Sequence, residues 1–172
     1  NLTGVNLSGA NLQGTDLAGA NLQGTNLAGA DLTRADLTRA DLTRAISDQR
    51  TVWPDGFDPE AAGAYKISSG EEPTGINLSG VDLSGLNLTV EDLSGVDLSG
   101  SNLFGVDFTG MNLSGANLTG ANLTEAQLSG ANLTEANLSG ANLTEANLSW
   151  VYLSSGAHLA GTDLAGANLT GA

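Results

Sequence analysis

The chain has 172 residues, a formal net charge of -14, 4% aromatic residues and no cysteine, so disulfides and thiolate metal sites are excluded. Its apolar runs are too short to span a membrane. All five basic residues lie between Arg34 and Lys66 and residues 67–172 contain eleven acidic ones, so direct binding to nucleic acid is not expected, because phosphate backbones repel acidic surfaces.

Residues 1–45 form the first predicted element, a block in which leucine recurs every five residues from Leu2 to Leu42. A small residue commonly stands two positions before the leucine, Asn or Asp stands one before, and Ser or Thr and then Gly often follow. A period of five fits neither an α-helix nor a continuous strand. It fits a short extended piece and a corner, in which the small residue and leucine point inward, Asn or Asp points outward, and glycine supplies the positive φ of a type II turn.

A single five-residue repeat cannot fold alone. Ordering five residues costs about 5–10 kcal/mol, whereas burying one leucine returns only about 1.5–3 kcal/mol. The repeats are therefore expected to stack, so that backbone ladders and a shared leucine column stabilise them collectively.

Residues 46–75 interrupt the repeat and are predicted to form a loop or cap, because Trp-Pro, Asp-Gly and Asp-Pro pairs are turn signals. Two interpretations stay open. Either Trp53 and Phe57 cover the open edge of a coil, or Trp53, Phe57 and Asp58 form a candidate partner-binding loop. The segment is expected to leave the stack without destroying it.

Residues 76–172 form a second block, in which the leucine phase holds from Leu78 to Leu153. The phase then slips by one residue near 154–157, and Gly156 is the expected extra residue, absorbed by a bulge at a corner. Glu91 stands where a small inward residue belongs, so it is expected to turn outward, to find a partner or to become protonated.

The repeat Ala-Asn/Asp-Leu-Ser/Thr-Gly resembles the A-(D/N)-L-x-x motif of the pentapeptide repeat family, over residues 1–45 and 76–172. The stretch from Thr51 to Ala64 is similar to an interruption, T-x-W-P-x-G-F-D-P-x-x-A-G-A, of many cyanobacterial members. The resemblance implies an all-β fold, a right-handed quadrilateral β-helix with four repeats and about 20 residues per coil. Leu118, Leu123, Leu128 and Leu133 should then occupy four successive faces, with Leu138 stacked on Leu118. The core is expected to include Leu7, Leu27, Leu83, Leu103, Phe108, Leu118, Leu128 and Leu138.

Eight repeats carry another residue where glycine is expected at the corner. These corners are predicted to have negative φ, because non-glycine residues avoid positive φ. They are Arg34, Arg39, Arg44, Val90, Glu125, Glu135, Glu145 and Trp150.

No catalytic, metal or cofactor site is predicted, and no cofactor is expected. The sole histidine, His158, occupies an outward position, and general-base catalysis needs a positioned nucleophile and an orienting group beside it. The repeats also lack the nonapeptide spacing of calcium-binding β-rolls.

The leading functional hypothesis is a rigid, non-enzymatic scaffold that binds an unknown protein partner through its sides or its loop. The alternative, implied by the family resemblance, is an acidic DNA mimic that inhibits a DNA-handling enzyme such as gyrase. Against it, each predicted column of outward residues in the second block holds one Asp.

No membrane partner is expected, and oligomers through end-to-end or side contacts stay open. No signal peptide is visible, and the sequence does not distinguish a cytoplasmic from an exported protein. It also leaves open whether Asn1, which lies inside a repeat, is the natural N-terminus.

Overall fold

The structure is a computed structural model that describes residues 1–67, 77–84, 92–154 and 156–172. The predictions made for Val90 and Glu91 fall outside these residues. The chain divides into two compact units, unit 1 (Asn1–Ser68) and unit 2 (Ser69–Ala172), and each is described by itself.

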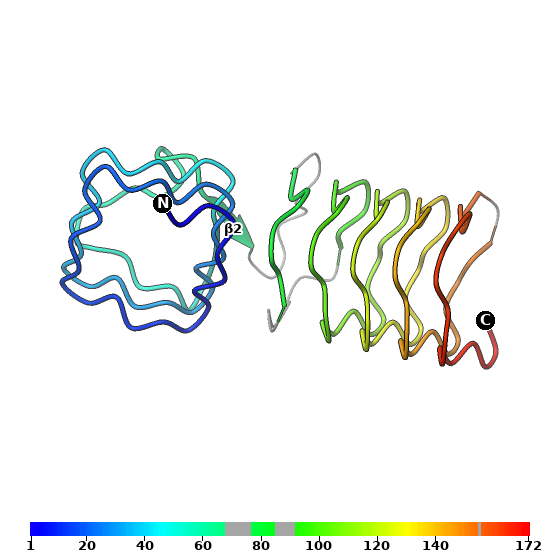
Figure 1. Cartoon of the computed structure of the whole chain (residues 1–172). Helices are drawn as coiled ribbons and strands as arrows, with labels where there is room; N and C mark the ends of the chain where they lie inside the picture. Colours follow the sequence, from blue (N-terminus) through cyan, green and yellow to red (C-terminus); the bar gives the residue numbers. More distant parts are fainter. Residues whose placement is uncertain (68–76, 85–91, 155) are drawn as a thin grey trace. The chain divides into compact units, whose positions relative to one another are not determined.

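Unit 1 is a stack of coils with a nearly square outline (Figure 1). Outward residues twenty positions apart pair in parallel, as Asn6 does with Asn26. The backbone N–H groups of Leu7 and Gly9 donate to the carbonyl oxygens of Asn26 and Ala28 in the next coil, both at 2.8 Å. Each of these repeats is thus hydrogen-bonded to the next coil at its leucine and at its corner glycine.

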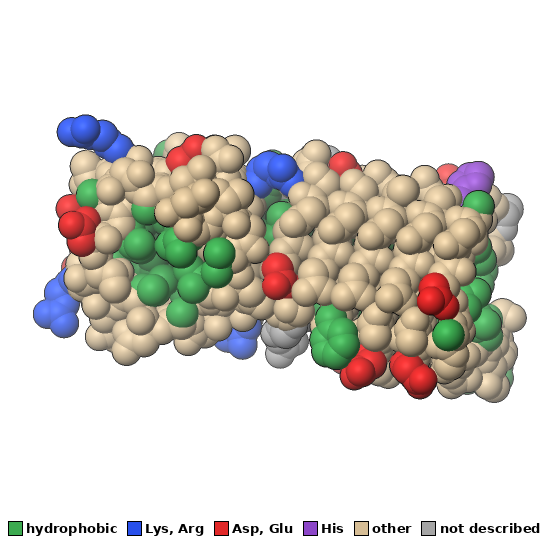
Figure 2. Space-filling view, viewed as in Figure 1, with side chains coloured by type: hydrophobic (Ala, Val, Ile, Leu, Met, Phe, Trp, Pro, Cys, Tyr) green, Lys and Arg blue, Asp and Glu red, His purple; other side chains and the backbone are tan. Residues whose placement is uncertain are grey.

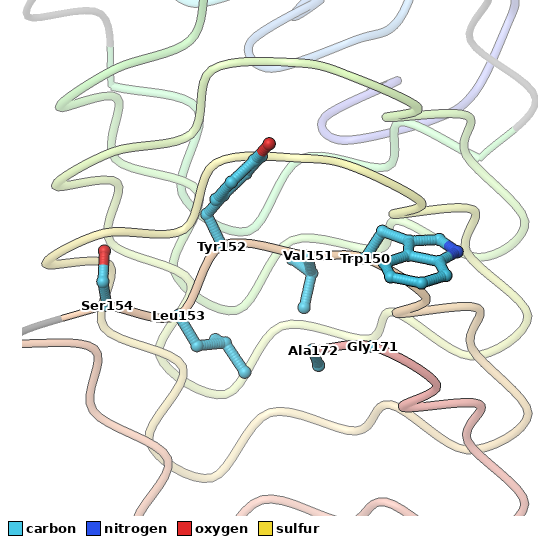
Figure 3. Close-up of a pocket in the computed structure, with 7 residues that line it drawn as sticks. All are labelled: Trp150, Val151, Tyr152, Leu153, Ser154, Gly171 and Ala172. Atoms are coloured by element: carbon cyan, nitrogen blue, oxygen red, sulfur yellow. The ribbon is translucent and has the colours of Figure 1, made fainter.

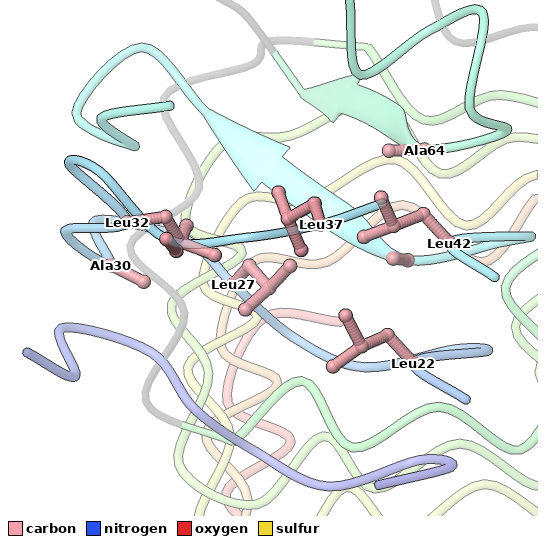
Figure 4. Close-up of a cluster of buried hydrophobic side chains, with 9 residues drawn as sticks. Leu22, Leu27, Ala30, Leu32, Leu37, Leu42 and Ala64 are labelled. Carbon is pink, nitrogen blue, oxygen red and sulfur yellow. The ribbon is translucent and has the colours of Figure 1, made fainter. Parts of the chain in front are cut away.

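The leucines of unit 1 fill its interior (Figure 4). Those of the second coil, such as Leu22 and Leu27, are fully buried, whereas Leu7 and the other leucines of the first coil are half-buried. Full burial of one leucine contributes about 1.5–3 kcal/mol, so the stability of the stack resides in its inner coils.

The stack continues into the interruption, through two short strands, β1 (Ile46–Asp48) and β2 (Tyr65–Ile67). They pair in parallel with Ile46 opposite Tyr65, and Val52 pairs with Asp31. The expectation that residues 46–75 leave the stack is therefore wrong for both strands and for Val52. The reason is that the ladder is made by backbone groups, so a coil can continue where the repeat has lost its leucines.

Unit 2 repeats the same coil with a register of twenty residues, as in the pairing of Asn117 with Asn137. Leu118, Leu123, Leu128 and Leu133 are all fully buried, and the N–H of Leu118 donates to the carbonyl of Asn137 at 2.7 Å. The prediction of four faces per coil, with Leu138 stacked on Leu118, is confirmed. Of the other expected core residues, Leu27, Leu83, Leu103, Phe108, Leu128 and Leu138 are buried, whereas Leu7 is only half-buried and packs against the core of unit 1.

The register of unit 2 changes from twenty to twenty-one residues near its C-terminal end. Asn132 pairs with Tyr152, twenty residues later, whereas Asn137 pairs with His158, twenty-one residues later. Gly156 lies between Tyr152 and His158 in the chain and has a φ of 96°. A residue is thus inserted at the corner, and the later pairings resume in phase.

The prediction of negative φ at corners without glycine is wrong. Seven of the eight have φ between 57° and 61°, and Val90 is the eighth. The N–H groups of Arg44, Glu125, Glu145 and Trp150 make the same ladder bonds as glycine corners, as Glu125 does with Thr144 at 2.9 Å. A different turn would break these bonds to the next coil, so the stack imposes positive φ on residues that disfavour it.

Candidate functional site

Trp53 and Phe57 stack on each other, with ring centroids 5.4 Å apart and ring planes 28° apart. Both are half-buried and pack against the buried cluster of unit 1, together with Ala62. Their aromatic surface is thus directed to the end of the leucine column. This placement favours the capping interpretation for these two side chains.

Asp58, the third residue of the candidate loop, is exposed and shapes the chain locally. Its carboxylate accepts a hydrogen bond from the N–H of Ala61 at 3.0 Å, and its carbonyl accepts one from the N–H of Ala62 at 3.2 Å. The structure therefore separates Asp58, a turn-forming residue, from the two rings that face the core.

Sequence reasoning missed a buried carboxylate at the end of β1. Asp48 is 8% exposed and accepts hydrogen bonds from the N–H of Gly29 and of Arg50, both at 2.9 Å. The guanidinium of Arg50 donates from Nε at 2.9 Å and forms an ion pair at 2.7 Å. The Asp-x-Arg spacing in the sequence was the signal that could have indicated this ion pair. At other corners the glycine N–H donates to a backbone carbonyl of the next coil, and at Gly29 the carboxylate of Asp48 takes the place of that carbonyl.

The pKa of Asp48 reflects two opposing influences. Burial raises this pKa, but the hydrogen bonds from Arg50 and Gly29, together with the charge of Arg50, hold it below its ordinary value. Asp48 is therefore ionised at neutral pH, and its role is to anchor the coil.

The outward faces of unit 2 carry side-chain ladders. In one column Nδ2 of Asn122 donates to Oδ1 of Asn102 at 3.0 Å, and Nδ2 of Asn102 donates to Oδ1 of Asp82 at 3.0 Å. Asn112 and Asn117 likewise donate to Asp92 and Asp97. The amides all point toward the earlier coil, so an Asp, which only accepts, satisfies the first amide of the column.

The same side chains also close the corners. Oδ1 of the outward Asn or Asp accepts the N–H of the residue two positions later, as Asp107 does from Thr109 at 2.9 Å. The hydroxyl of the Ser or Thr two positions later is the largest cause that lowers the pKa of five carboxylates, and its backbone N–H lowers the pKa further. These carboxylates are Asp31, Asp36, Asp41, Asp92 and Asp107, and the side chain of Gln23 also lowers the pKa of Asp41. Each of these groups is thus ordered and charged at neutral pH.

Negative charge is widely spaced on these faces. One column reads Asp82, Asn102, Asn122, Asn142 and Asp163, with three neutral residues between its acids. Figure 2 accordingly shows a broad face of uncharged polar side chains with few acidic ones. In unit 1, in contrast, Asp16 and Asp36 lie directly opposite each other.

Two exposed aromatic residues, Trp150 and Tyr152, lie near the C-terminal end of unit 2. They border a hollow of about 460 Å³ that Val151, Leu153 and Ala172 also line. In Figure 3 Val151 and Leu153 point to one side of the chain and Tyr152 to the other. Sequence reasoning noted Trp150 only as an unusual corner, although both residues depart from the repeat.

The described residues offer little chemistry. Among residues 1–67, 77–84, 92–154 and 156–172, no group of three His, Cys, Asp or Glu residues could hold a metal ion. Over the same ranges no helix is long and apolar enough to cross a membrane. His158 is exposed and pairs through its backbone with Asn137.

Buried leucine columns, four faces per coil and polar ladders outside define a β-solenoid repeat protein. A family model described as pentapeptide repeats, in eight copies, matches residues 1–39, 74–110, 92–120, 121–154 and 155–172. The chain belongs to the pentapeptide repeat family, whose fold is the right-handed quadrilateral β-helix and whose members are structural or protein-interaction modules.

Solved structures of the family resemble the chain. HetL, a pentapeptide repeat protein involved in heterocyst differentiation regulation from the cyanobacterium Nostoc sp. strain PCC 7120, is 28% identical, with 98% of this chain and 88% of that chain covered and a TM-score of 0.30. Rfr23 from the cyanobacterium Cyanothece 51142 is 24% identical, with 95% and 90% covered and a TM-score of 0.29. QnrB1, a plasmid-mediated fluoroquinolone resistance protein, is 18% identical, with 94% and 89% covered and a TM-score of 0.26. No curated protein matches, and the family assignment rests on the repeat itself.

Proposed function

We propose that this protein is a rigid, non-enzymatic scaffold that binds a protein partner. The observation that carries the proposal is the set of ordered ladders on unit 2, in which Asn122, Asn102 and Asp82 are joined side chain to side chain. Side chains already fixed in this way lose little conformational entropy when a partner covers them. The faces are therefore suited to recognition by surface shape and polarity.

The arrangement does not favour catalysis. A catalytic site needs a nucleophile, a base and an orienting group converging on one point. On the described faces the Ser and Thr hydroxyls instead donate to the neighbouring Asn or Asp, as Thr124 does to Asn122 at 2.7 Å. Their hydrogen-bonding capacity is used within the corner.

The interruption supports the same proposal by a different route. Because Trp53 and Phe57 pack on the core of unit 1, we assign them to a cap that closes the leucine column. An exposed edge would invite unspecific strand addition, which a cap prevents. Specific binding is then left to the faces of the coils.

Acidity is the observation that favours an inhibitory DNA mimic, since residues 67–172 contain no Lys or Arg. The spacing of the charges opposes it. A mimic of a duplex needs dense rows of negative charge, whereas three neutral residues separate Asp82 from Asp163. The scaffold is therefore the better supported function.

A scan of the four faces tests the scaffold. Asn117→Arg, Asn122→Arg, Gln127→Arg and Asn132→Arg each place one cation on a different face of one coil. Proteins captured from the cell of origin by the immobilised chain are purified and titrated calorimetrically against the wild type and the four variants. One or two variants should weaken binding at least tenfold while the others serve as internal controls. If no captured protein binds the purified chain, or if no variant weakens binding, the faces are not the interaction surface.

A further inference from the structure

One edge of unit 2 carries an exposed aromatic ring within the stack, on a coil that has a paired coil on each side. Phe104 is 44% exposed and occupies the outward position just before the corner, where most repeats have Ser or Thr. In those repeats the hydroxyl donates to the outward Asn or Asp, as Thr124 does to Asn122 at 2.7 Å. Phe104 cannot make this bond, and its ring lies outside the leucine core. The aromatic side chain therefore adds little to the stability of the coil.

Two acidic side chains follow Phe104 along the same edge. The N–H of Gly105, the residue after Phe104, donates to the carbonyl of Thr124 at 2.9 Å. Glu125 follows Thr124 and therefore lies at the same corner on the adjoining coil, and the same ladder places Glu145 at that corner one coil further. Figure 2 shows a hydrophobic side chain beside acidic ones at one edge of unit 2. Since neighbouring strands are about 4.8 Å apart, one bound segment can reach the ring and both carboxylates.

The two glutamates are exposed, and no positive charge of unit 2 offsets them. Neither carboxylate accepts a hydrogen bond or forms an ion pair with any residue that the structure describes. The carboxylate of Glu145 lies on the backbone of Gly166, where an added Cβ atom would come within 2.6 Å of Oε1. Like charges stacked on neighbouring strands destabilise a sheet, and residues 67–172 contain no Lys or Arg. A cation bound at this edge would remove the repulsion between Glu125 and Glu145.

An aromatic ring next to carboxylates suits arginine better than lysine. The planar guanidinium stacks on the face of a ring and pairs with a carboxylate through two parallel hydrogen bonds, whereas the ammonium of lysine is a compact and strongly hydrated charge. In an extended segment alternate side chains are about 7 Å apart. Two arginines separated by one residue can therefore reach the ring of Phe104 and the carboxylates of Glu125 and Glu145 at the same time.

We propose that the edge formed by Phe104, Glu125 and Glu145 binds an arginine-rich segment of a partner protein. One guanidinium stacks on the ring of Phe104, another pairs with the two carboxylates, and the negative charge of unit 2 attracts the segment. This inference rests on the proposed scaffold function and assigns it an edge and a class of partner.

The repeat itself supplies the variants for a test. Phe104→Ser introduces a residue that other repeats have at this position and leaves the charge unchanged. Glu125→Gly and Glu145→Gly each restore the usual corner residue. Glu135→Gly is the matched control, because Glu135 is also an exposed corner glutamate with a φ of 61°, but it lies at a different corner of the coil. None of these changes should lower the melting temperature or alter the far-UV circular dichroism.

Fluorescence anisotropy with a labelled peptide of alternating Arg and Ser measures binding. The peptide should bind the wild type and the Glu135→Gly variant alike, whereas Phe104→Ser, Glu125→Gly and Glu145→Gly should each weaken binding about threefold, as loss of one exposed cation–π contact or ion pair does. A peptide of alternating Lys and Ser should bind the wild type more weakly. The inference is wrong if the wild type does not bind the Arg-Ser peptide, or if Phe104→Ser has no effect. It is also wrong if Glu135→Gly weakens binding as much as Glu125→Gly, because binding would then follow net charge alone.

The face scan separates this inference from the scaffold function. If binding of a captured partner is weakened by one of the face variants but is unchanged in the Phe104→Ser/Glu125→Gly/Glu145→Gly variant, the scaffold stands and the assigned edge is wrong. If no partner is captured but the Arg-Ser peptide binds as described, the edge stands and the face-based scaffold does not.

Discussion

The corners without glycine show how strain is distributed at the scale of single residues. Arg39 has a φ of 57°, and an Arg39→Gly variant should stabilise unit 1 by about 0.5–1 kcal/mol, since relief of the left-handed conformation exceeds the greater chain entropy of glycine. Chemical denaturation followed by circular dichroism measures this change. A destabilised variant would show that the Arg39 side chain makes a compensating contact.

The reciprocal substitution checks the same argument. Gly120 has a φ of 64°, and a Cβ atom there would meet no atom within 4 Å. Gly120→Ala should therefore cost about 1 kcal/mol from backbone strain alone. The two variants should thus shift stability in opposite directions.

Asp48 is the residue on which the bend between β1 and Val52 depends. Asp48→Ala removes the carboxylate that accepts from the N–H groups of Gly29 and Arg50 and pairs with the Arg50 guanidinium, although the Gly29 N–H keeps Oγ1 of Thr51 as a second acceptor at 3.2 Å. Because these hydrogen bonds are part-buried and one of them has a substitute, unit 1 should lose about 1–2 kcal/mol. Hydrogen exchange at Gly29 and Ala30 would report the loss locally, and Asp55→Ala, at an exposed site, should change stability by less than about 0.5 kcal/mol.

The carboxylates that close corners predict the response of the fold to acid. Asp31, Asp36, Asp41, Asp92 and Asp107 have lowered pKa values in the folded chain, through hydrogen bonds from the Ser or Thr two residues later. Their contribution is complete above the unfolded pKa of about 3.9 and is lost as the pH falls through the lower folded values. The melting temperature should drop below about pH 4, and replacement of all five by Asn should flatten that drop. An unchanged acid profile would contradict the argument.

Sequence could predict which side chains point inward but not the conformation of every corner. The leucine period places Leu118 and Leu128 inside, because the alternation of an extended segment is local. The φ of Glu125 or Trp150 is decided by ladder bonds to residues twenty positions away, and this nonlocal constraint overrides the local preference. Asp48 escaped prediction for the same reason, since its partner Gly29 lies one coil earlier.

At the scale of elements, the five-residue repeat predicts the register of the coils within the repeat blocks, but it does not predict the register around the interruption. Within unit 2 the register of twenty follows from four repeats per coil. Around the interruption the register is twenty-one between Asp31 and Val52 and nineteen between Ile46 and Tyr65. Leucine spacing does not encode these values, because the loop that Trp53 and Phe57 anchor sets them.

Deletion of Val52 to Gly63 tests the independence of the two units. The deletion removes the acceptor of the Leu32 N–H and the acceptor of the Arg44 N–H, together with the stacked rings. Unit 1 should be destabilised, whereas unit 2, with its own leucine core and ladder, should stay folded. Protection of the Leu118 and Leu128 amides in hydrogen exchange would measure this. If that protection is lost, unit 2 requires the segment.

At the scale of the whole molecule, the net charge and the spacing of the charges favour different functions, the first a DNA mimic and the second a scaffold. The net charge of -14 favours attraction to cationic partners. The pairing of Asp82 with Asn102 and of Asp97 with Asn117 spaces the acids apart and converts them into acceptors for amide ladders. Like charges directly opposite destabilise neighbouring strands, which explains the spacing without any demand from a partner.

A gyrase assay decides between scaffold and DNA mimic. Because each outward Asp of unit 2 has neutral neighbours in its column and Glu125 and Glu145 form a single stacked pair at a corner, we expect no inhibition of gyrase at micromolar concentration and no salt-dependent affinity for DNA-binding enzymes. Supercoiling assays with the purified chain measure this, and the variant with Asp82, Asp92, Asp97 and Asp107 changed to Asn is the control. Clear inhibition by the wild type that disappears in this variant would make the mimic the better function. Inhibition that persists in the variant would arise from another part of the chain, and the face scan from Asn117→Arg to Asn132→Arg would then locate it.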